Sequence, residues 1–148
     1  MTERRNATTV RHRLRHAVPR TAAPLGTLAG VGAAFVYVAA VDPGRPGHYP
    51  VCPFLSVTGL YCPACGGLRS AHAVAHGDLA AALGANAAAV LLFAAFAAFW
   101  IHWFTRAVRG AGYAFPVRLT AWHGWAAGAL LLAFTVVRNT PLGTALVP

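Results

Sequence analysis

Long apolar segments alternate with polar segments along the whole chain. Three of them, residues 23–41, 79–104 and 119–137, contain no Asp, Glu, Lys or Arg. Since a helix rises about 1.5 Å per residue, segments of this length cover most or all of a hydrocarbon core of ~30 Å. The pattern therefore predicts an all-α integral membrane protein with three transmembrane helices.

The polar segments are predicted to form a basic cytoplasmic tail at 1–22, a long extracytoplasmic loop at 42–78, a short cytoplasmic loop at 105–118 and an extracytoplasmic tail at 138–148. The long loop begins "DPGRPGHYP", where Pro and Gly end the first helix. Asp78 stands immediately before the second apolar segment. It is the predicted helix cap, because a carboxylate accepts hydrogen bonds from the free backbone N–H groups of a first turn.

The composition agrees with a bilayer as the surrounding solvent. The chain has 148 residues, of which 57% are hydrophobic and 10% are charged, whereas an ordinary soluble domain has about 25% charged residues. Such a chain has too few polar side chains to cover a surface exposed to water. We therefore expect a multi-pass protein of the cell membrane, with the lipid bilayer as its first partner.

The distribution of arginine predicts the orientation. All 12 basic residues are Arg, and six of them lie in the first twenty residues. The 105–118 segment carries three, the 42–78 segment two and the C-terminal tail one. Because basic residues are retained on the cytoplasmic side, the N-terminus is predicted to be cytoplasmic and the 42–78 loop extracytoplasmic. A cleaved signal peptide, with "VAA" at 38–40 as the cleavage site, is the alternative interpretation of the first apolar segment.

Several function classes are poorly supported by this sequence. The net charge of +9 is concentrated in the tail, with no aromatic and basic surface beside it, so nucleic acid is not an expected partner. The absence of Lys excludes a phosphate-loop lysine and a Schiff base. Neither Ser56 nor Ser70 stands in a nucleophile-elbow pattern. A binding or structural protein is therefore favoured over an enzyme.

All three cysteines of the chain lie within fourteen residues of the long loop. Cys52, Cys62 and Cys65 occur in "CPFLSVTGLYCPAC", and proline follows the first two. Proline fixes one backbone dihedral and removes a donor, so each Cys-Pro pair is expected to begin a defined turn. Their clustering indicates that the three thiols act together.

A short helix is predicted directly after the cysteine turn, in "GGLRSAHAVAHGD". Arg69, His72 and His76 then lie four, seven and eleven residues after Cys65, on one helical face. With Cys65 at the start of this helix, the positive helix end and Arg69 are expected to lower the pKa of its thiol.

Three interpretations of the cysteines remain open from the sequence. The first is a disulfide between two of them, favoured by an oxidising compartment, with one thiol left for exchange. The second is a metal site, with zinc as the expected ion and three thiolates completed by His72, His76 or His48. The third is that the thiols only pack in the loop. If the loop is redox-active, Cys62, Cys65 and Arg69 are the candidate catalytic residues.

Polar residues near the predicted outer ends of the helices form a second candidate site. Asn86 lies inside the second apolar segment, and Arg138 and Asn139 follow the third. Together with Arg69 they are predicted to converge in a small polar cup for an anionic or headgroup-like ligand. The alternative is an Asn that hydrogen-bonds between helices and an Arg that contacts lipid phosphate.

These residues together resemble a family of small bacterial membrane proteins, the domain of unknown function 2752. The similarity covers about residues 48–140 and rests on "CPFLSVTGLYCPACGGLR", "HGD" and "NAA". The matching positions are Cys52, Pro53, Gly59, Cys62, Pro63, Cys65, Gly66, Arg69, Gly77, Asp78 and Asn86. Leu68 replaces a threonine of the family pattern and Ala87 a proline. The resemblance supports the topology and marks a site, and it implies no reaction.

The function expected at this stage is a cysteine loop, stabilised by a disulfide or by zinc, that caps the helices and binds lipid or a partner membrane protein. The alternative is thiol–disulfide exchange at the outer face through Cys62 and Cys65, for which the Cys-X-X-Cys turn at a helix start is the right local structure.

Overall fold

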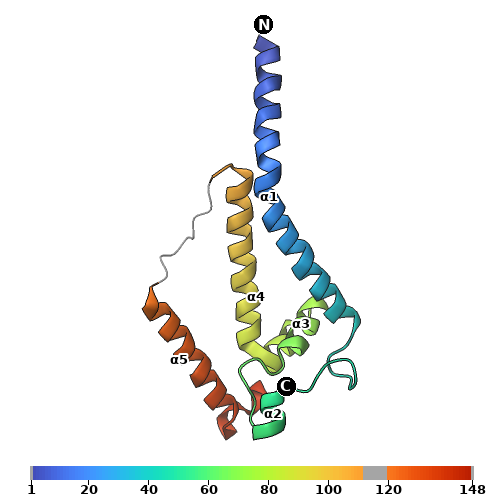
Figure 1. The fold of residues 1–148 in the computed structure, drawn as a ribbon. Coiled ribbons are helices and arrows are strands. Elements are labelled where there is room, and N and C mark those ends of the chain that lie inside the picture. Colours follow the sequence, from blue (N-terminus) through green and yellow to red (C-terminus); the bar gives the residue numbers. More distant parts are fainter. Residues whose placement is uncertain (1, 112–119, 148) are drawn as a thin grey trace. The chain divides into compact units, whose positions relative to one another are not determined.

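The computed structural model describes residues 2–111 and 120–147, and all regular elements in these ranges are helical (Figure 1). They are α1 (Thr2–Ala40), α2 (Pro53–Thr58), α3 (Gly67–Ala75), α4 (Leu79–Val108), α5 (Ala121–Arg138) and a 3-10 helix, η1 (Pro141–Leu146). The predicted all-α class is confirmed. The basic tail and the first apolar segment belong to one helix, and α3 is the predicted short helix of the loop. The sequence did not predict α2.

In the part of the chain that the structure describes, two helices, and not the predicted three, are long and apolar enough to cross a membrane. They are Arg20–Ala40, with 21 residues and a mean hydropathy of 1.6, and Leu79–Val108, with 30 residues and a mean hydropathy of 2.1. Only 11% of each stretch is buried within the protein, so neither is the covered core helix of a globular domain. By length and composition alone, both helices are able to span a bilayer.

The prediction of a third transmembrane helix is wrong. Residues 119–137 correspond to α5, an 18-residue helix with His123 in its first turn and Arg138 at its end. At about 1.5 Å per residue its full length is about 27 Å, and the polar ends shorten the apolar part further. The prediction rested on the length of the apolar segment and gave too little weight to the polar residues at its ends, which lower the mean hydropathy of the helix.

The chain divides into two compact units, Met1–Gly32 with Ala95–Pro116, and Ala33–Ala94 with Val117–Pro148. In the first unit, the indole of Trp100 donates to the carbonyl of Pro24 at 2.8 Å, and Arg20 donates to the carbonyl of Gly110 at 3.2 Å. These bonds join α1 to the end of α4 within that unit.

The second unit contains all three cysteines and is joined by polar contacts at the start of α4. The Ser70 hydroxyl of α3, fully buried, donates to the carbonyl of Ala82 at 2.6 Å and lies 3.2 Å from the carbonyl of Asn86. Phe35 and Phe93 meet edge to face at 5.4 Å between ring centroids. Small buried residues, Ala71 and Ala82, let α3 approach α4 closely.

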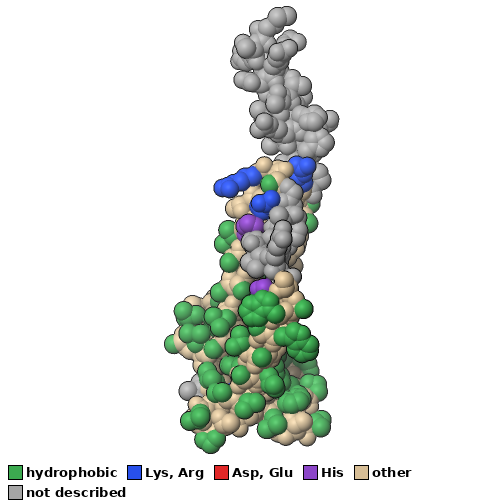
Figure 2. Space-filling view, turned by 90° about the vertical axis from the view of Figure 1, so that its left-hand side faces the viewer, with side chains coloured by type: hydrophobic (Ala, Val, Ile, Leu, Met, Phe, Trp, Pro, Cys, Tyr) green, Lys and Arg blue, Asp and Glu red, His purple; other side chains and the backbone are tan. Residues whose placement is uncertain are grey.

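Apolar side chains remain exposed on the long helices of this unit. Leu91 and Leu92 of α4 and Leu130 and Leu132 of α5 are all exposed, and Figure 2 shows such hydrophobic side chains spread over the surface. Exposed apolar area of this kind is costly in water and is expected where lipid or another protein covers it.

A carboxylate cap begins α4. Gly77 has a left-handed backbone with φ of 79°, which turns the chain after α3. Asp78 Oδ1 then accepts from the Ala81 N–H at 2.9 Å, and the Asp78 carbonyl accepts from the Ala82 N–H at 3.0 Å. This is the geometry of an N-cap.

Replacing this cap should lower stability measurably. Asp78→Ala is expected to cost about 1 kcal/mol, because an N–H of the first turn loses its acceptor. Asp78→Asn keeps an acceptor oxygen and should cost much less. Thermal unfolding of the detergent-solubilised protein, followed by circular dichroism, checks both. Equal losses in the two variants would contradict a capping role.

Candidate metal centre

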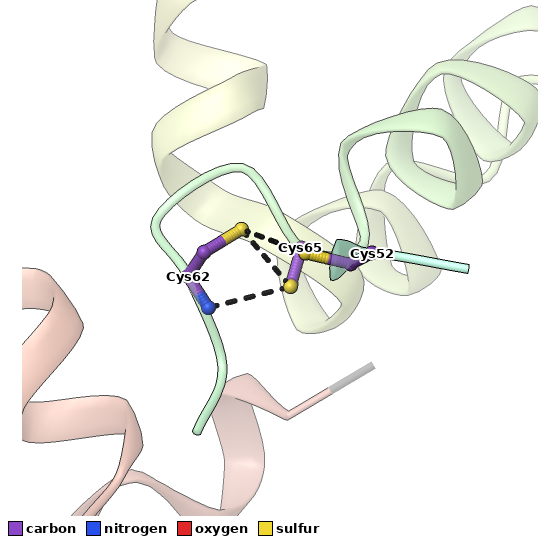
Figure 3. A group of neighbouring side chains, drawn as sticks. All are labelled: Cys52, Cys62 and Cys65. Carbon is purple, nitrogen blue, oxygen red and sulfur yellow. Dashed lines mark hydrogen bonds between the residues drawn. The ribbon is translucent and has the colours of Figure 1, made fainter. Parts of the chain in front are cut away.

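Three sulfurs converge in the second unit (Figure 3). The Sγ atoms of Cys62 and Cys65 are 3.0 Å apart, those of Cys52 and Cys62 are 3.6 Å apart, and all three lie within 4.8 Å of one another. None of the three takes part in a disulfide. Two segments supply them: Cys52 immediately precedes α2, and Cys62 and Cys65 lie in the turn between α2 and α3.

The local sequence explains this convergence. Pro53 begins α2, and Gly59 ends it with a left-handed φ of 71°, which turns the chain back. The Cys65 N–H then donates to the Cys62 carbonyl at 3.1 Å, closing the "CPAC" turn, and Gly66 with φ of 80° starts α3. The chain thus folds back over a single short helix to return to Cys52.

The three thiols have different environments. The pKa of Cys52, at the start of α2, is lowered, mainly by a hydrogen bond from the backbone N–H of Leu55. Burial raises the pKa of Cys65 to about 12, with the neighbouring thiols adding to the shift. The expectation that Cys65 has a lowered pKa is therefore wrong. Helix α3 starts only at Gly67, and Arg69 is exposed to solvent.

Asn86 of α4 fixes the cysteine turn by hydrogen bonds to its backbone. Its side chain is fully buried, and Nδ2 donates to the carbonyls of Pro63 and Cys65, both at 2.9 Å. The Asn86 backbone is extended, with φ of −165° and ψ of 96°, inside the otherwise helical α4. Its Oδ1 accepts from the Ala89 N–H at 2.9 Å, which caps the helix that resumes there. One side chain therefore both restarts α4 and fixes the turn.

Arg138 holds the same turn from α5. Only 1% of its surface is exposed, and Nη1 donates to the carbonyls of Cys62 at 3.2 Å and Cys65 at 3.0 Å. Nη2 donates to the Leu146 carbonyl at 2.9 Å. The guanidinium lies 5.1 Å from the Phe134 ring centroid and 5.8 Å from that of Tyr61.

Asn139 completes the contacts of the turn. Its Oδ1 accepts from the Tyr61 N–H at 2.8 Å, and its Nδ2 donates to the carbonyls of Tyr61 at 2.9 Å and Thr135 at 2.8 Å. The structure thus brings Asn86, Arg138 and Asn139 of the predicted polar cup together. All three side chains, however, form hydrogen bonds to backbone atoms of the cysteine turn. Arg69 lies apart, exposed on α3.

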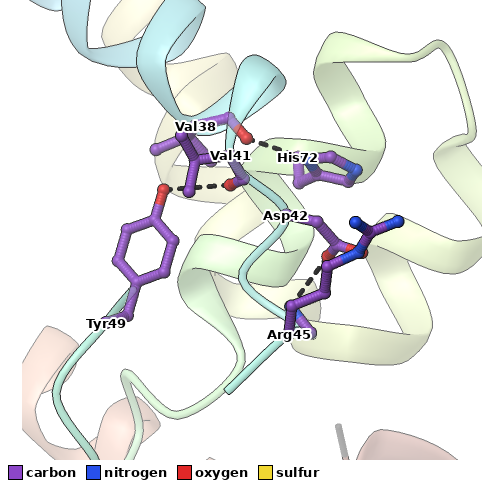
Figure 4. A network of polar contacts seen from close by, with 7 residues as sticks. Val38, Val41, Asp42, Arg45, Tyr49 and His72 are labelled. Carbon is purple, nitrogen blue, oxygen red and sulfur yellow. Dashed lines mark hydrogen bonds and ion pairs between the residues drawn. The ribbon is translucent and has the colours of Figure 1, made fainter. Parts of the chain in front are cut away.

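The histidines do not lie with the sulfurs. His72 Nδ1 is 2.8 Å from the Val38 carbonyl (Figure 4), and His76 Nδ1 is 2.8 Å from the His72 carbonyl. Among the residues that the structure describes, the group of possible metal ligands contains the cysteines and no histidine. His72 instead lines a separate cavity of about 380 Å³ with Asp42, Arg45 and His48.

The model of a family described as Protein of unknown function (DUF2752) matches residues 52–100. Over these residues the chain is similar to that family. No curated protein and no solved structure matches the chain.

The DUF2752 match confirms the family resemblance predicted from the sequence, over a shorter range. It begins at Cys52 and includes the other two cysteines and Asn86. Arg138 and Asn139 lie outside it, although they hold the turn that the DUF2752 region forms. The site is therefore built from the matched region and from the segment that returns to it.

The sulfur cluster of the DUF2752 region fits a soft metal ion. Zn–S bonds of ~2.3 Å in a tetrahedral site separate sulfurs by about 3.8 Å. This is close to the 3.6 Å between the Cys52 and Cys62 sulfurs and longer than the 3.0 Å between those of Cys62 and Cys65. A cavity of about 580 Å³ is lined by all three cysteines, by Arg45 and Arg69 and by no acidic residue. Three residues thus offer sulfur atoms to a metal ion at the edge of this cavity.

Sequence reasoning missed two contributors. Ser70 joins α3 to α4, and Tyr61 exchanges hydrogen bonds with Asn139. A lone serine in a short helix and a tyrosine before a cysteine carry no pattern that would mark them. Tyr61 acts mainly through its backbone, which no side-chain pattern can reveal.

Asn86 should be essential for holding the turn. Asn86→Ala is expected to cost about 2–3 kcal/mol, because the half-buried Pro63 carbonyl loses its donor and the Ala89 N–H loses its acceptor. Asn86→Asp keeps the acceptor and loses both donors, so it should cost nearly as much. Thermal unfolding of both variants checks this, with Thr27→Ala, at a half-buried position on α1 outside the site, as a control expected to change stability by less than about 0.5 kcal/mol. An unfolding temperature near that of the wild type in Asn86→Asp would contradict the assigned donors.

Proposed function

We propose that the cysteine turn is a metal-binding cap on a membrane-associated helical protein, and that zinc, or another soft divalent ion, is its metal. The observation that carries this is the mutual proximity of three sulfurs from two segments, all within 4.8 Å. Three thiolates are a donor set that zinc prefers.

The geometry favours a metal over a structural disulfide. A disulfide joins two sulfurs and leaves the third without a role, whereas a metal uses all three. The sulfur atoms of Cys52 and Cys62 are 3.6 Å apart, which is close to the separation of two thiolates that bind the same zinc ion. The buried side chains of Asn86 and Arg138 hold the turn by its backbone and leave its thiols free to act as ligands.

A metal here would tie the loop to the helices. It would join the start of α2 to the turn, and the turn is bonded to α4 through Asn86 and to α5 through Arg138. The loop and α2 expose Val51, Phe54, Val57 and Leu60, and Val57 is 85% exposed. This apolar surface suits contact with lipid or with a partner membrane protein, which is the role we assign to the cap.

The proposed location of the cap is the outer face of the cell membrane of a bacterium, with the N-terminus in the cytoplasm. The support is the excess of arginine in the first twenty residues over the 42–78 loop. An oxidising outer compartment is compatible with this, because a bound metal protects thiolates from oxidation.

Thiol–disulfide exchange is the second candidate. The 3.0 Å between the sulfurs of Cys62 and Cys65 favours it, since little movement would join them. In that role the two thiols would be oxidised to a disulfide while a partner's disulfide is reduced to two thiols. The pKa of about 12 for Cys65 counts against it, because a buried protonated thiol is a poor nucleophile.

Metal content tests the proposal directly. The purified full chain is expected to hold one zinc equivalent, and its cysteines should resist maleimide mass tagging until a chelator is added. Cys52→Ser, Cys62→Ser and Cys65→Ser should each lose most of the metal, while Ser56→Ala on α2 should keep it. Elemental analysis and mass tagging are the measurements. Thiols blocked until reduction, and indifferent to chelator, would instead establish a disulfide and refute the metal centre.

The sidedness of the loop is a separate prediction. In intact cells treated with a chelator, a membrane-impermeant maleimide should label the cysteines as fully as it does after lysis. Ser56→Cys in a background without the native cysteines gives a metal-independent control. Labelling of that variant only after lysis would place the loop in the cytoplasm.

A further inference from the structure

Arg138 is a buried charge without an anionic partner among the described residues. It is 1% exposed, and the ion pair found in the described part of the chain joins Arg45 to Asp42 instead. Its Nη groups reach only backbone carbonyls, and its buried Nε has no hydrogen-bond partner. Burying a cation is costly unless an opposite charge lies near.

The position of the guanidinium indicates where that opposite charge belongs. Arg138 Nη1 contacts the carbonyls of Cys62 and Cys65, which supply two of the three sulfurs. Neutral thiols would leave the guanidinium uncompensated, and so would a disulfide. Three thiolates around a divalent ion carry one net negative charge, which matches the single positive charge of Arg138.

We propose that Arg138 is the internal counter-charge of the metal centre and a positioning residue that favours three thiolates around a divalent ion. This rests on the proposed function. A trivalent ion would leave the guanidinium unpaired, and a monovalent ion would leave a net negative charge. The same side chain orients the ligands, because its bonds to both cysteine carbonyls fix the turn. Partners of this kind typically change metal affinity by about 10- to 100-fold.

The test separates charge from shape. Arg138→Lys keeps the charge with fewer hydrogen bonds, and Arg138→Met keeps an apolar chain of similar length without the charge. Zinc affinity of the full chain in detergent is measured by competition with a chromophoric chelator. We expect a loss of about 10- to 100-fold in Arg138→Met and a clearly smaller loss in Arg138→Lys. Arg45→Met, which removes an exposed arginine beside the same cavity, is the matched control and should bind as the wild type does.

A second measurement keeps the test valid if a variant is less stable. The rise in unfolding temperature on adding zinc compares loaded and metal-free forms of one variant, so a general loss of stability cancels. At one fixed zinc concentration this rise should be clearly smaller in Arg138→Met than in the wild type, and closer to the wild-type value in Arg138→Lys. Equal affinities in Arg138→Met and the wild type, or equal losses in the Met and Lys variants, would overturn the counter-charge role.

The wild type distinguishes this inference from the function on which it rests. Failure of the wild type to bind zinc would refute the metal centre, and the counter-charge with it. Zinc binding in the wild type that persists in Arg138→Met would refute the counter-charge alone.

Discussion

The carbonyl oxygen of Cys65 is the point on which the second unit depends. It accepts one hydrogen bond from Asn86 of α4 and one from Arg138 of α5, so both of its lone pairs are used. Side chains from two helices thereby hold one peptide group of a loop that has little apolar core of its own. Bonds of this kind, buried and charge-assisted, are among the stronger ones available to a protein.

This arrangement explains why polar residues lie in such an apolar chain. Asn86 and Arg138 would each be costly to bury alone. Their donors are directed to carbonyls of the turn, so each group offsets the desolvation of the other. The turn in return presents its sulfurs on the side away from these bonds, toward the cavity. Stability and a candidate chemical site therefore come from the same contacts.

The helical class, the short helix after the cysteines and the family could be predicted from the sequence, because each follows from local patterns. The number of candidate spans could not, since the polar residues at the ends of α5 matter more than its apolar centre. The convergence of Cys52 with Cys62 and Cys65 was expected from their clustering. The separation of His72 and His76 from them was not, because helical spacing does not reveal which way a face points. The targets of Asn86 and Arg138 are backbone atoms, which no sequence pattern identifies.

The extended backbone at Asn86 has a consequence for depth in a bilayer. It divides α4, so that the continuous helix is residues 87–108, which at about 1.5 Å per residue reaches about 33 Å. That length matches a hydrocarbon core of ~30 Å. The residues before the break, and the cysteine turn that Asn86 bonds to, would then stand at the level of the lipid headgroups, where water and dissolved ions have access.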